Sequence, residues 1–270
     1  DVEDVRSRVP GGARHPPRVP ALTGRLLDFL GRHGARATFF VVGDVARAHP
    51  ELIRRIAGEG HEIGCHSDTH AALDRQTPAA FRDDLARNLE ALRAAGVDGV
   101  RGYRAPYFSL TADTAWAYGV LAELGFTYSS SVLPSRSPLH GWPGFGRTPR
   151  AVDGVLEMPV TLLPAPLPPL PPVPNGGGVY FRVLPWPLLR RSLRADARAG
   201  RPVLGYLHPY DVDTAPQPFA HPGFARWSPG NWLMHANRGA VLERLERVAR
   251  MGFAFQPYGD HARAPGRAPA

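Results

Sequence analysis

Cysteine is nearly absent from this sequence, lysine is missing altogether, and no hydrophobic run is long. The single cysteine, Cys65, excludes an internal disulfide framework and a cysteine-rich zinc ribbon in a chain of 270 residues. No apolar stretch reaches the length of a membrane span, so no transmembrane segment is predicted. The sequence opens without methionine or a signal-peptide pattern, so we expect residues upstream and leave the localisation open between cytoplasm and cell envelope.

Because lysine is missing, all 32 basic residues are arginines, and the formal net charge is +8. A charge of this sign attracts anionic partners such as nucleic acid, lipid phosphate or acidic polysaccharide. The arginines are scattered along expected helices and are not clustered with aromatic residues, so no nucleic-acid partner is predicted. No Gly-x-Gly-x-x-Gly motif opens a helix after a strand, so a dinucleotide-binding fold has no support either.

Short apolar segments alternate with amphipathic segments along the chain. The amphipathic segments predict helices at 21–34, 49–60, 78–96, 111–125, 184–200 and 237–252. The apolar segments predict strands at 37–42, 61–65, 100–105, 126–132, 154–160, 201–207 and 253–258. Strands that alternate with helices pair in parallel, so the sequence predicts an α/β fold, either a barrel or a doubly wound sheet.

A segment rich in proline and then glycine, residues 159–178, interrupts this alternation. Proline has no N–H group and continues neither a strand ladder nor a helix. Leucine and valine alternate with the prolines, which favours a loop packed on the body of the protein. Long loops in compact domains are often functional, so the two interpretations are a substrate rim or a plain surface loop.

Polar residues of catalytic type follow the predicted strands. They form the clusters DVED at 1–4, HSDTH at 66–70, RAPY at 104–107 and HPYDVD at 208–213. The carboxyl ends of parallel strands lie on one side of an α/β fold, and active sites are built there. The clusters are therefore expected to converge.

His66 and His70 lie four residues apart after a strand, and a loop or first helical turn can bring their rings together. With a carboxylate from elsewhere they would make a three-ligand site with open positions, as catalytic zinc requires. We favour a metal site over two structural histidines. His61 is expected to be structural, and Cys65 to point to the opposite face of its strand.

In this order, the motifs DVED, HSDTH, RAPY and LHP resemble those of the polysaccharide deacetylases with the NodB homology domain, carbohydrate esterase family 4. The resemblance implies an α/β fold of the NodB type, an irregular (β/α)7 TIM-like barrel, as a single domain over 1–270. The later segments GGGVYFRVLP and NRGAVLERLERVARMGFAF resemble the exopolysaccharide and exosortase-associated subgroup, as a C-terminal extension from about residue 176.

The resemblance also implies catalytic roles. Asp1 would be the general base, and Arg104 would pair with it. The backbone N–H of Tyr107 would form part of an oxyanion hole, and His208 would be the general acid toward the leaving amine. Leu207 would line the pocket for the acyl methyl group.

The implied metal ligands are His66, His70 and a carboxylate from Glu3 or Asp4. Alternation along a strand puts Asp1 and Glu3 on one face, which favours Glu3. Ser67 would hold the loop by a hydrogen bond. The metal is a divalent ion, with Zn²⁺ first and Co²⁺, Ni²⁺ or Fe²⁺ as alternatives on the same ligands.

The sequence departs from the family where an aspartate often orients the catalytic histidine. Ser129 stands there and cannot supply the charge, and Asp211 or Asp213 are the possible substitutes. Aromatic side chains that could stack on sugars, with a core position as the alternative for each tryptophan, are Tyr107, Tyr180, Trp186 and Trp227.

The predicted function is therefore metal-dependent hydrolysis of an N-acetyl group from an amino sugar of a bacterial polysaccharide or its precursor, free or lipid-linked. One alternative is a deformylase or other C–N amide hydrolase acting on a lipid-linked sugar or a small amide. The other is a catalytically inactive glycan-binding protein. The same barrel and metal site could serve any of them.

Overall fold

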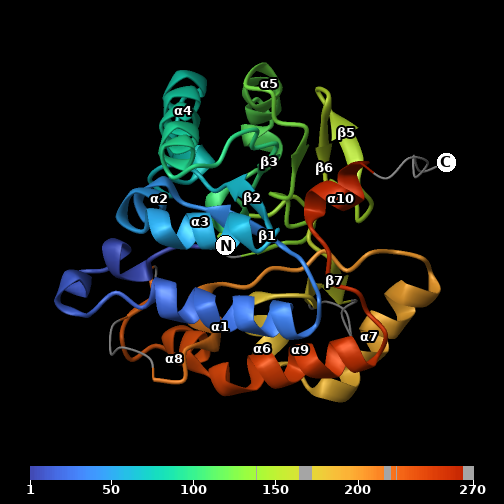
Figure 1. Cartoon of the computed structure of the whole chain (residues 1–270). Coiled ribbons are helices and arrows are strands. Elements are labelled where there is room, and N and C mark those ends of the chain that lie inside the picture. The colour runs from blue at the N-terminus through green and yellow to red at the C-terminus, as the bar shows by residue number, and fades with distance from the viewer. Residues whose placement is uncertain (138, 164–171, 216–219, 223, 264–270) are drawn as a thin grey trace. The chain divides into compact units, whose positions relative to one another are not determined.

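The computed structural model describes residues 1–137, 139–163, 172–215, 220–222 and 224–263. The chain divides into two compact units, each built from segments that are distant in sequence. The first unit combines residues 1–35 with 174–255, and the second combines 36–173 with 256–270. In Figure 1 the chain is coloured from blue at the N-terminus to red at the C-terminus, so the segments of each unit can be followed by colour. A single deacetylase domain over 1–270 stays a prediction.

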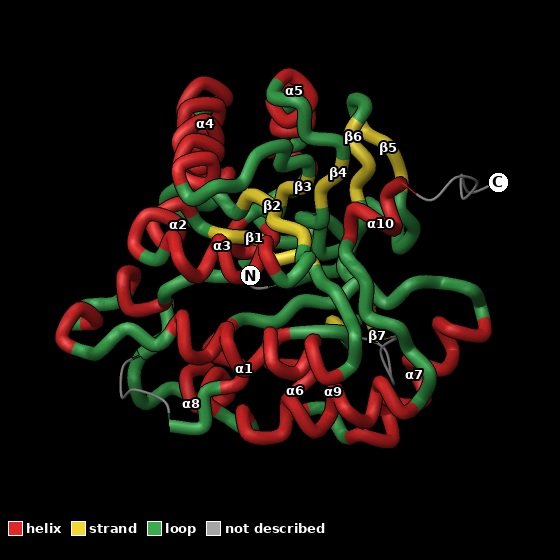
Figure 2. The backbone as a smooth tube through the Cα atoms, in the orientation of Figure 1, coloured by secondary structure: helices red, strands yellow, loops and turns green. Residues whose placement is uncertain are grey.

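A six-stranded sheet forms the centre of the second unit, and its strands are yellow in Figure 2. Its spatial order is β1-β2-β3-β4-β6-β5; all neighbours pair in parallel except β5, which is antiparallel to β6. The strands are β1 (Thr38–Val41), β2 (Glu62–Cys65), β3 (Gly102–Tyr103), β4 (Tyr128–Ser129), β5 (Arg150–Val152) and β6 (Val155–Glu157). Five strands in parallel register agree with the α/β organisation that the alternating sequence predicts.

Two glycines allow aromatic rings to lie across this sheet. A Cβ atom at Gly64 would come within 2.5 Å of the Phe40 ring, and one at Gly102 within 2.2 Å of the Tyr128 ring. Phe40 and Tyr128 are both almost completely buried. Any larger residue at either glycine would displace a ring of the core, so both positions require glycine.

Helices of the second unit lie between strands β1 and β4 along the chain, and one more follows near the C-terminus. They are α2 (Gly43–Ala48), α3 (Pro50–Gly58), α4 (Pro78–Ala94), α5 (Ala117–Glu123) and α10 (Tyr258–Arg263), with short 3₁₀ turns at Leu73–Arg75, Pro106–Phe108 and Ala112–Thr114. Helix α4 begins with Thr77 as its N-cap, whose side chain accepts from the Ala80 N–H, and with proline at the first helical position. Its apolar face enters a core that includes Leu73, Phe81, Leu85, Tyr103, Leu110, Tyr118 and Leu121.

The first unit is mainly helical. Its helices are α1 (Val19–Arg32), α6 (Gly178–Val183), α7 (Trp186–Arg198), α8 (Pro229–His235) and α9 (Val241–Arg250), with 3₁₀ turns at Val5–Arg8, Gly12–Arg14, Pro209–Val212 and Arg238–Ala240. Figure 1 shows α1 and α9 side by side, and His33 after α1 pairs with Glu246 of α9 at 3.0 Å. The core of this unit consists of Leu22, Phe181, Leu189, Leu193, Val212, Val241 and Val248.

Two strands expected from the sequence do not form. The sequence predicts strands at 201–207 and 253–258, but the structure has no strand ladder at 201–207 and begins α10 at Tyr258. Isolated hydrogen bonds serve the first segment, including one from the Gly178 N–H to the Tyr206 carbonyl at 2.9 Å. In the second, Pro257 lacks an N–H, and the Tyr258 N–H donates to the Thr38 hydroxyl at 2.8 Å. Apolar composition alone does not decide whether a segment pairs as a strand, because pairing also depends on its neighbours.

The loop predicted at 159–178 is described at its two ends only, because residues 164–171 lie outside the described part. Its ends form a two-stranded sheet of β7 (Leu162–Leu163) and β8 (Val173–Pro174). Whether the remainder is a substrate rim stays a prediction. Among the described helices, none has both the length and the apolar composition that a membrane span requires.

Candidate active site

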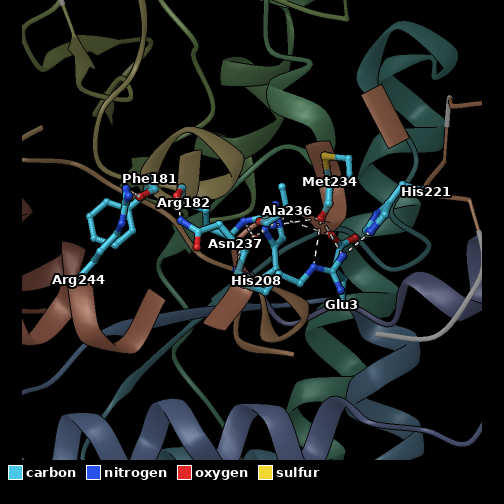
Figure 3. Close-up of polar contacts among 11 residues, drawn as sticks. Glu3, Phe181, Arg182, His208, His221, Met234, Ala236, Asn237 and Arg244 are labelled. Carbon is cyan, nitrogen blue, oxygen red and sulfur yellow. Dashed lines mark hydrogen bonds and ion pairs between the residues drawn. The ribbon is translucent and has the colours of Figure 1, made fainter. Parts of the chain in front are cut away.

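Two carboxylates of the N-terminal segment face the imidazole of His208 in the first unit. The Nε2 atom of His208 lies 3.7 Å from Asp1 Oδ2 and 3.6 Å from Glu3 Oε1. Val2 between them is buried, so the side chains alternate and Asp1 and Glu3 share a face. The backbone nitrogen of Asp1 fixes the segment by donating to the Leu207 carbonyl at 2.7 Å. Glu3 and His208 are both labelled in Figure 3.

Asp4 is engaged elsewhere. It is the N-cap of the 3₁₀ turn Val5–Arg8, and its Oδ1 accepts from the Arg6 backbone N–H at 3.0 Å. Its other oxygen forms an ion pair with the Arg6 guanidinium at 2.5 Å. A carboxylate that caps a turn and pairs with an arginine would have to leave both partners to bind a metal. Of the two carboxylates that the sequence left open, Asp4 is therefore the one with these competing partners, and Glu3 as the metal ligand stays a prediction.

The second ring nitrogen of His208 contacts Asp211. Asp211 Oδ2 lies 3.0 Å from His208 Nδ1 and accepts from the His208 backbone N–H at 2.8 Å. Burial alone would raise the pKa of Asp211, but the hydrogen bond from His208 and the positive charges of His208 and Arg182 outweigh it, so the pKa is lowered. Asp213, the other substitute, pairs with Arg18 at 2.8 Å. Asp211 is therefore the residue that orients His208.

In the second unit, the rings of His66 and His70 lie together at the end of β2. Their centroids are 4.9 Å apart and their planes are nearly perpendicular. His66 Nδ1 lies 2.7 Å from the Arg104 carbonyl, which can only accept, so Nδ1 carries the proton. The lone pair of the imidazole is then on Nε2, the arrangement that metal-binding histidines adopt. The donor chemistry of this pair fits a divalent metal.

The loop that carries these histidines has a strained backbone. Ser67 and His70 have φ angles of 67° and 59°, in the left-handed region that favours glycine. Helix α4 holds the loop: Asp84 accepts from the Asp68 N–H at 2.9 Å, and Asn88 donates to the Ser67 carbonyl at 2.7 Å. Strain of this kind persists only where the surrounding structure fixes it, and it occurs often at functional sites.

Arg104 is 2% exposed and lies at the end of β3. Its Nε donates to the Ser130 carbonyl and its Nη2 to the Ser130 hydroxyl, both at 2.9 Å. The guanidinium carbon lies 4.4 Å from the Phe40 ring centroid and 5.1 Å from that of Tyr258. The side chain is thus held rigidly by the second unit, and its pairing with Asp1 stays a prediction.

Tyr107 follows in the turn Pro106–Phe108. It and Phe108 have φ angles of 56° and 53°, so two consecutive residues with side chains adopt the left-handed conformation. The Tyr107 ring packs edge-on against His70, with centroids 4.7 Å apart. The turn therefore adjoins the histidine pair, and the oxyanion-hole role of the Tyr107 N–H stays a prediction.

Ser129, which replaces the expected aspartate, has a structural role. Its hydroxyl donates to the Ser131 hydroxyl at 2.7 Å, and the Ser131 hydroxyl accepts from the Ala105 N–H at 2.8 Å. Glu157 of β6 accepts from the Ser131 N–H at 2.7 Å. Burial raises the pKa of Glu157 against these hydrogen bonds. These contacts connect the ends of β3, β4 and β6.

The proposed substrate contacts lie in the first unit. Leu207 and Trp186 are half-buried against its core, and the Arg247 guanidinium lies over the Trp186 ring at 5.4 Å. Tyr180 is also half-buried, which raises the pKa of its hydroxyl. Trp227, by contrast, is 88% exposed. Their roles toward sugar stay predictions.

Two residues behave as structural groups. His61 Nδ1 accepts from the Ala37 N–H at 3.3 Å, and burial lowers the pKa of the ring. Cys65 is completely buried, which raises the pKa of its thiol and makes it a poor ligand and nucleophile. Over the part of the chain that the structure describes, no three His, Cys, Asp or Glu side chains are already placed to hold a metal ion together.

Sequence reasoning missed Asp84, Asn88 and Arg182. Asp84 and Asn88 lie four residues apart, so they share a face of α4, and two polar residues on the buried face are a readable signal. Arg182 carries no such signal, because it is one of 32 basic residues. Only its burial in the structure distinguishes it.

Two family models match adjacent parts of the chain. Residues 14–129 match the model described as polysaccharide deacetylase, and residues 130–260 match one described as a domain of unknown function (DUF3473). The first match contains His66, His70, Arg104 and Tyr107. The second contains His208 and Asp211.

Curated relatives are similar over part of their length. A chitooligosaccharide deacetylase from Bradyrhizobium sp. (strain ANU 289) is 42% identical over 95 residues, which are 35% of this chain and 43% of the relative. A peptidoglycan-N-acetylglucosamine deacetylase from Bacillus cereus is 34% identical over 85 residues, 32% of this chain and 31% of the relative. The chain thus spans less than half of the length of these relatives.

A solved structure extends the likeness to most of the fold. A protein from Mycobacterium smegmatis assigned as a polysaccharide deacetylase has a TM-score of 0.59 and 26% identity, over 89% of this chain and 75% of its own. The predicted fold class, an α/β fold of the deacetylase type, is thereby confirmed.

Proposed function

We propose that this chain is a metal-dependent hydrolase that removes an N-acetyl group from an amino sugar of a bacterial polysaccharide or its precursor, because residues 14–129 match the polysaccharide deacetylase model. The observation that carries the proposal is the histidine pair. The hydrogen bond from His66 Nδ1 to the Arg104 carbonyl puts the lone pair of this ring on Nε2, and the His70 ring lies next to it. The similarity to chitooligosaccharide and peptidoglycan deacetylases supports an amino-sugar substrate.

His66 and His70 would supply two metal ligands, and Glu3 is the proposed carboxylate because Asp4 is engaged by Arg6. Zn²⁺ suits two imidazoles and a carboxylate, and Co²⁺, Ni²⁺ and Fe²⁺ are alternatives for the same donors. When bound, a divalent metal supplies Lewis acidity toward an amide carbonyl and a water molecule.

The remaining steps are proton transfers by residues of this chain. Asp1 is the proposed general base, which takes a proton from the attacking water. His208 is the proposed general acid, which gives a proton to the nitrogen of the leaving amine. Each such transfer typically accelerates a reaction by ~10²–10⁴-fold. Asp211 holds the ring of His208 through Nδ1, so Nε2 is the atom that exchanges the proton.

Arg104 and Tyr107 would each stabilise a negative charge. The rigidly held guanidinium of Arg104 is proposed to keep Asp1 ionised, and the Tyr107 N–H to donate to the oxyanion that develops on the acyl oxygen. Leu207 is proposed to line the acyl pocket, with Tyr180 and Trp186 beside the sugar. In more detail, the proposal includes a lipid-linked substrate and a role in exopolysaccharide synthesis.

The test combines metal content with acetate release from an N-acetylglucosamine oligomer, with and without added zinc. Acetate release that depends on metal is the expected result. Bound metal without acetate would direct the test to formylated and lipid-linked sugars, and metal without any turnover would favour a glycan-binding protein. A protein that binds no metal would overturn the proposal.

Two variants separate the roles. His66→Ala is expected to lose metal and activity together, whereas Asp1→Asn is expected to retain metal and lose hydrolysis. Wild-type turnover by Asp1→Asn would remove Asp1 as the base. His61→Gln is the matched control for His66→Ala, because His61 is a buried histidine outside the site.

A further inference from the structure

The two carboxylate oxygens of Asp211 face different partners. Oδ2 serves His208, through the ring Nδ1 at 3.0 Å and the backbone N–H at 2.8 Å. Oδ1 lies 3.0 Å from Nε of Arg182, and both side chains of this ion pair are 0% exposed. The carboxylate therefore connects the imidazole of His208 to a buried guanidinium.

Arg182 is fixed from several sides. It belongs to α6, and its Nη1 donates to the carbonyls of Met234 and Ala236 at 3.1 and 2.7 Å. The Asn237 side chain in turn donates to the Arg182 carbonyl at 2.5 Å. Figure 3 shows Arg182, Asn237 and His208 next to one another. Because the guanidinium is planar and held by two carbonyls, its position next to the Asp211 carboxylate is set by the fold.

Burying an arginine and a carboxylate removes both from water, which is unfavourable unless each charge is compensated. A hydrophobic pair of similar volume would often stabilise a core as well. Stability alone is therefore a weak reason for a buried Arg182–Asp211 ion pair. The contact between Asp211 and the His208 ring is a better reason.

We propose that Arg182 is a positioning residue for the general acid: by holding Asp211, it fixes the orientation and tautomer of His208 and takes over part of the support that an aspartate at position 129 would give. This inference rests on the proposed function. It also gives a role to the part of the chain that matches a domain of unknown function, since Arg182, His208 and Asp211 all lie within residues 130–260.

A general acid matters only when the leaving group needs a proton. The amine released from an N-acetylated sugar is a poor leaving group without one, whereas 4-nitrophenolate, released from 4-nitrophenyl acetate, leaves unprotonated. A variant that acts through His208 should thus lose activity toward the amide and keep activity toward the ester. A variant that merely loosens the fold should lose both alike.

The experiment compares kcat on an N-acetylglucosamine oligomer and on 4-nitrophenyl acetate for the zinc-loaded wild type and Arg182→Lys, which keeps the charge and loses the planar fork. We expect kcat on the amide to fall ~10–100-fold with KM little changed, and kcat on the ester to fall less than ~3-fold. Asp211→Asn should show the same pattern. The double variant should be no worse than Asp211→Asn alone, because both act through one contact.

Arg244→Lys is the matched control. Arg244 also connects α6 to its surroundings, by donating to the Phe181 and Leu184 carbonyls at 2.6 and 2.8 Å. In the described part of the chain, neither of these bonds involves Asp211 or His208. Figure 3 shows it beside Phe181. It should change both substrates equally. Equal losses on amide and ester for Arg182→Lys, or a loss in KM alone, would overturn the proposal.

A second measurement does not depend on activity. The ¹⁵N chemical shifts of the His208 ring report which nitrogen carries the proton in the neutral imidazole. We expect Nδ1–H in the wild type and in Arg244→Lys, and a mixture of tautomers in Arg182→Lys. If the wild type hydrolyses neither substrate, the proposed function fails. The ¹⁵N shifts of the His208 ring would still test whether Arg182 sets the tautomer of His208. An unchanged tautomer in Arg182→Lys would refute its positioning role.

Discussion

Helix α4 braces the loop that carries His66 and His70, and the substitution Asp84→Asn tests that brace. Asp84 is 2% exposed, and its carboxylate accepts from the Asp68 N–H at 2.9 Å and from the Thr69 N–H and hydroxyl at 3.3 and 3.1 Å. Asparagine keeps one acceptor oxygen and turns an NH₂ group toward a donor, so at least one hydrogen bond is lost. The remaining hydrogen bonds are then made to a neutral acceptor instead of a charged one.

The magnitude follows from these bonds. A hydrogen bond to a buried charge contributes about 1.5–3 kcal/mol and a neutral one about 0.5–1.5 kcal/mol. Replacing three charged bonds by two neutral bonds is therefore expected to lower the free energy of unfolding by about 3.5–6 kcal/mol. Since the brace holds the left-handed backbone at Ser67 and His70, we also expect zinc affinity to fall ~10-fold.

The assay is urea denaturation of the metal-free protein, followed by zinc titration calorimetry. Asp83→Asn is the control, because it makes the same charge change at the preceding, exposed position of α4. Equal unfolding free energies for the two variants would refute the brace. A loss of stability with unchanged zinc affinity would show that the brace does not position the histidines.

Two further predictions concern strain and charge. Tyr107 has a φ angle of 56°, so Tyr107→Gly should be more stable than Tyr107→Ala by about 1 kcal/mol, as judged by urea denaturation; equal stabilities would argue against strain at this turn. Burial, together with the charges of Arg238 and His235, lowers the pKa of His221 from 6.5 to about 3, so the unfolded chain takes up this proton first as the pH falls. The free energy of unfolding should therefore fall between pH 6.5 and about 3, and His221→Gln should show a shallower decline over the same pH series.

Local patterns predicted much of the fold. Helix α4 was expected at 78–96 and spans Pro78–Ala94, since a capping threonine, a proline and a following glycine mark its ends. The strands from β1 to β4 and β6 were also located, because they are short apolar runs between helices. Residues 201–207 look the same in sequence but form no ladder, because pairing depends on a neighbouring strand that composition does not show.

The candidate site could likewise be predicted only in part from the sequence. Alternation alone placed Asp1 and Glu3 on one face, and the structure has both beside His208. The choice between Asp211 and Asp213 needed coordinates, although the run His-Pro-Tyr-Asp carries a usable signal: proline at the first position and aspartate at the third form a capping turn on His208. Arg182 could not be found from sequence, since only tertiary contacts make one arginine different from the others.

The family match and the folding units divide the chain at different places, and this explains why the deacetylase match alone describes the protein incompletely. The match ends at Ser129, in the last residue of β4, while the strand that pairs with β4, β6, comes from the part matched to a domain of unknown function. In that strand Glu157 accepts from the N–H groups of Ser131 and Val132. The sheet that carries the histidine pair is therefore completed by residues beyond the match. His208, Asp211 and Arg182 lie beyond it too, so the catalytic role that we propose for the second half of the chain rests on its side chains and not on its family description.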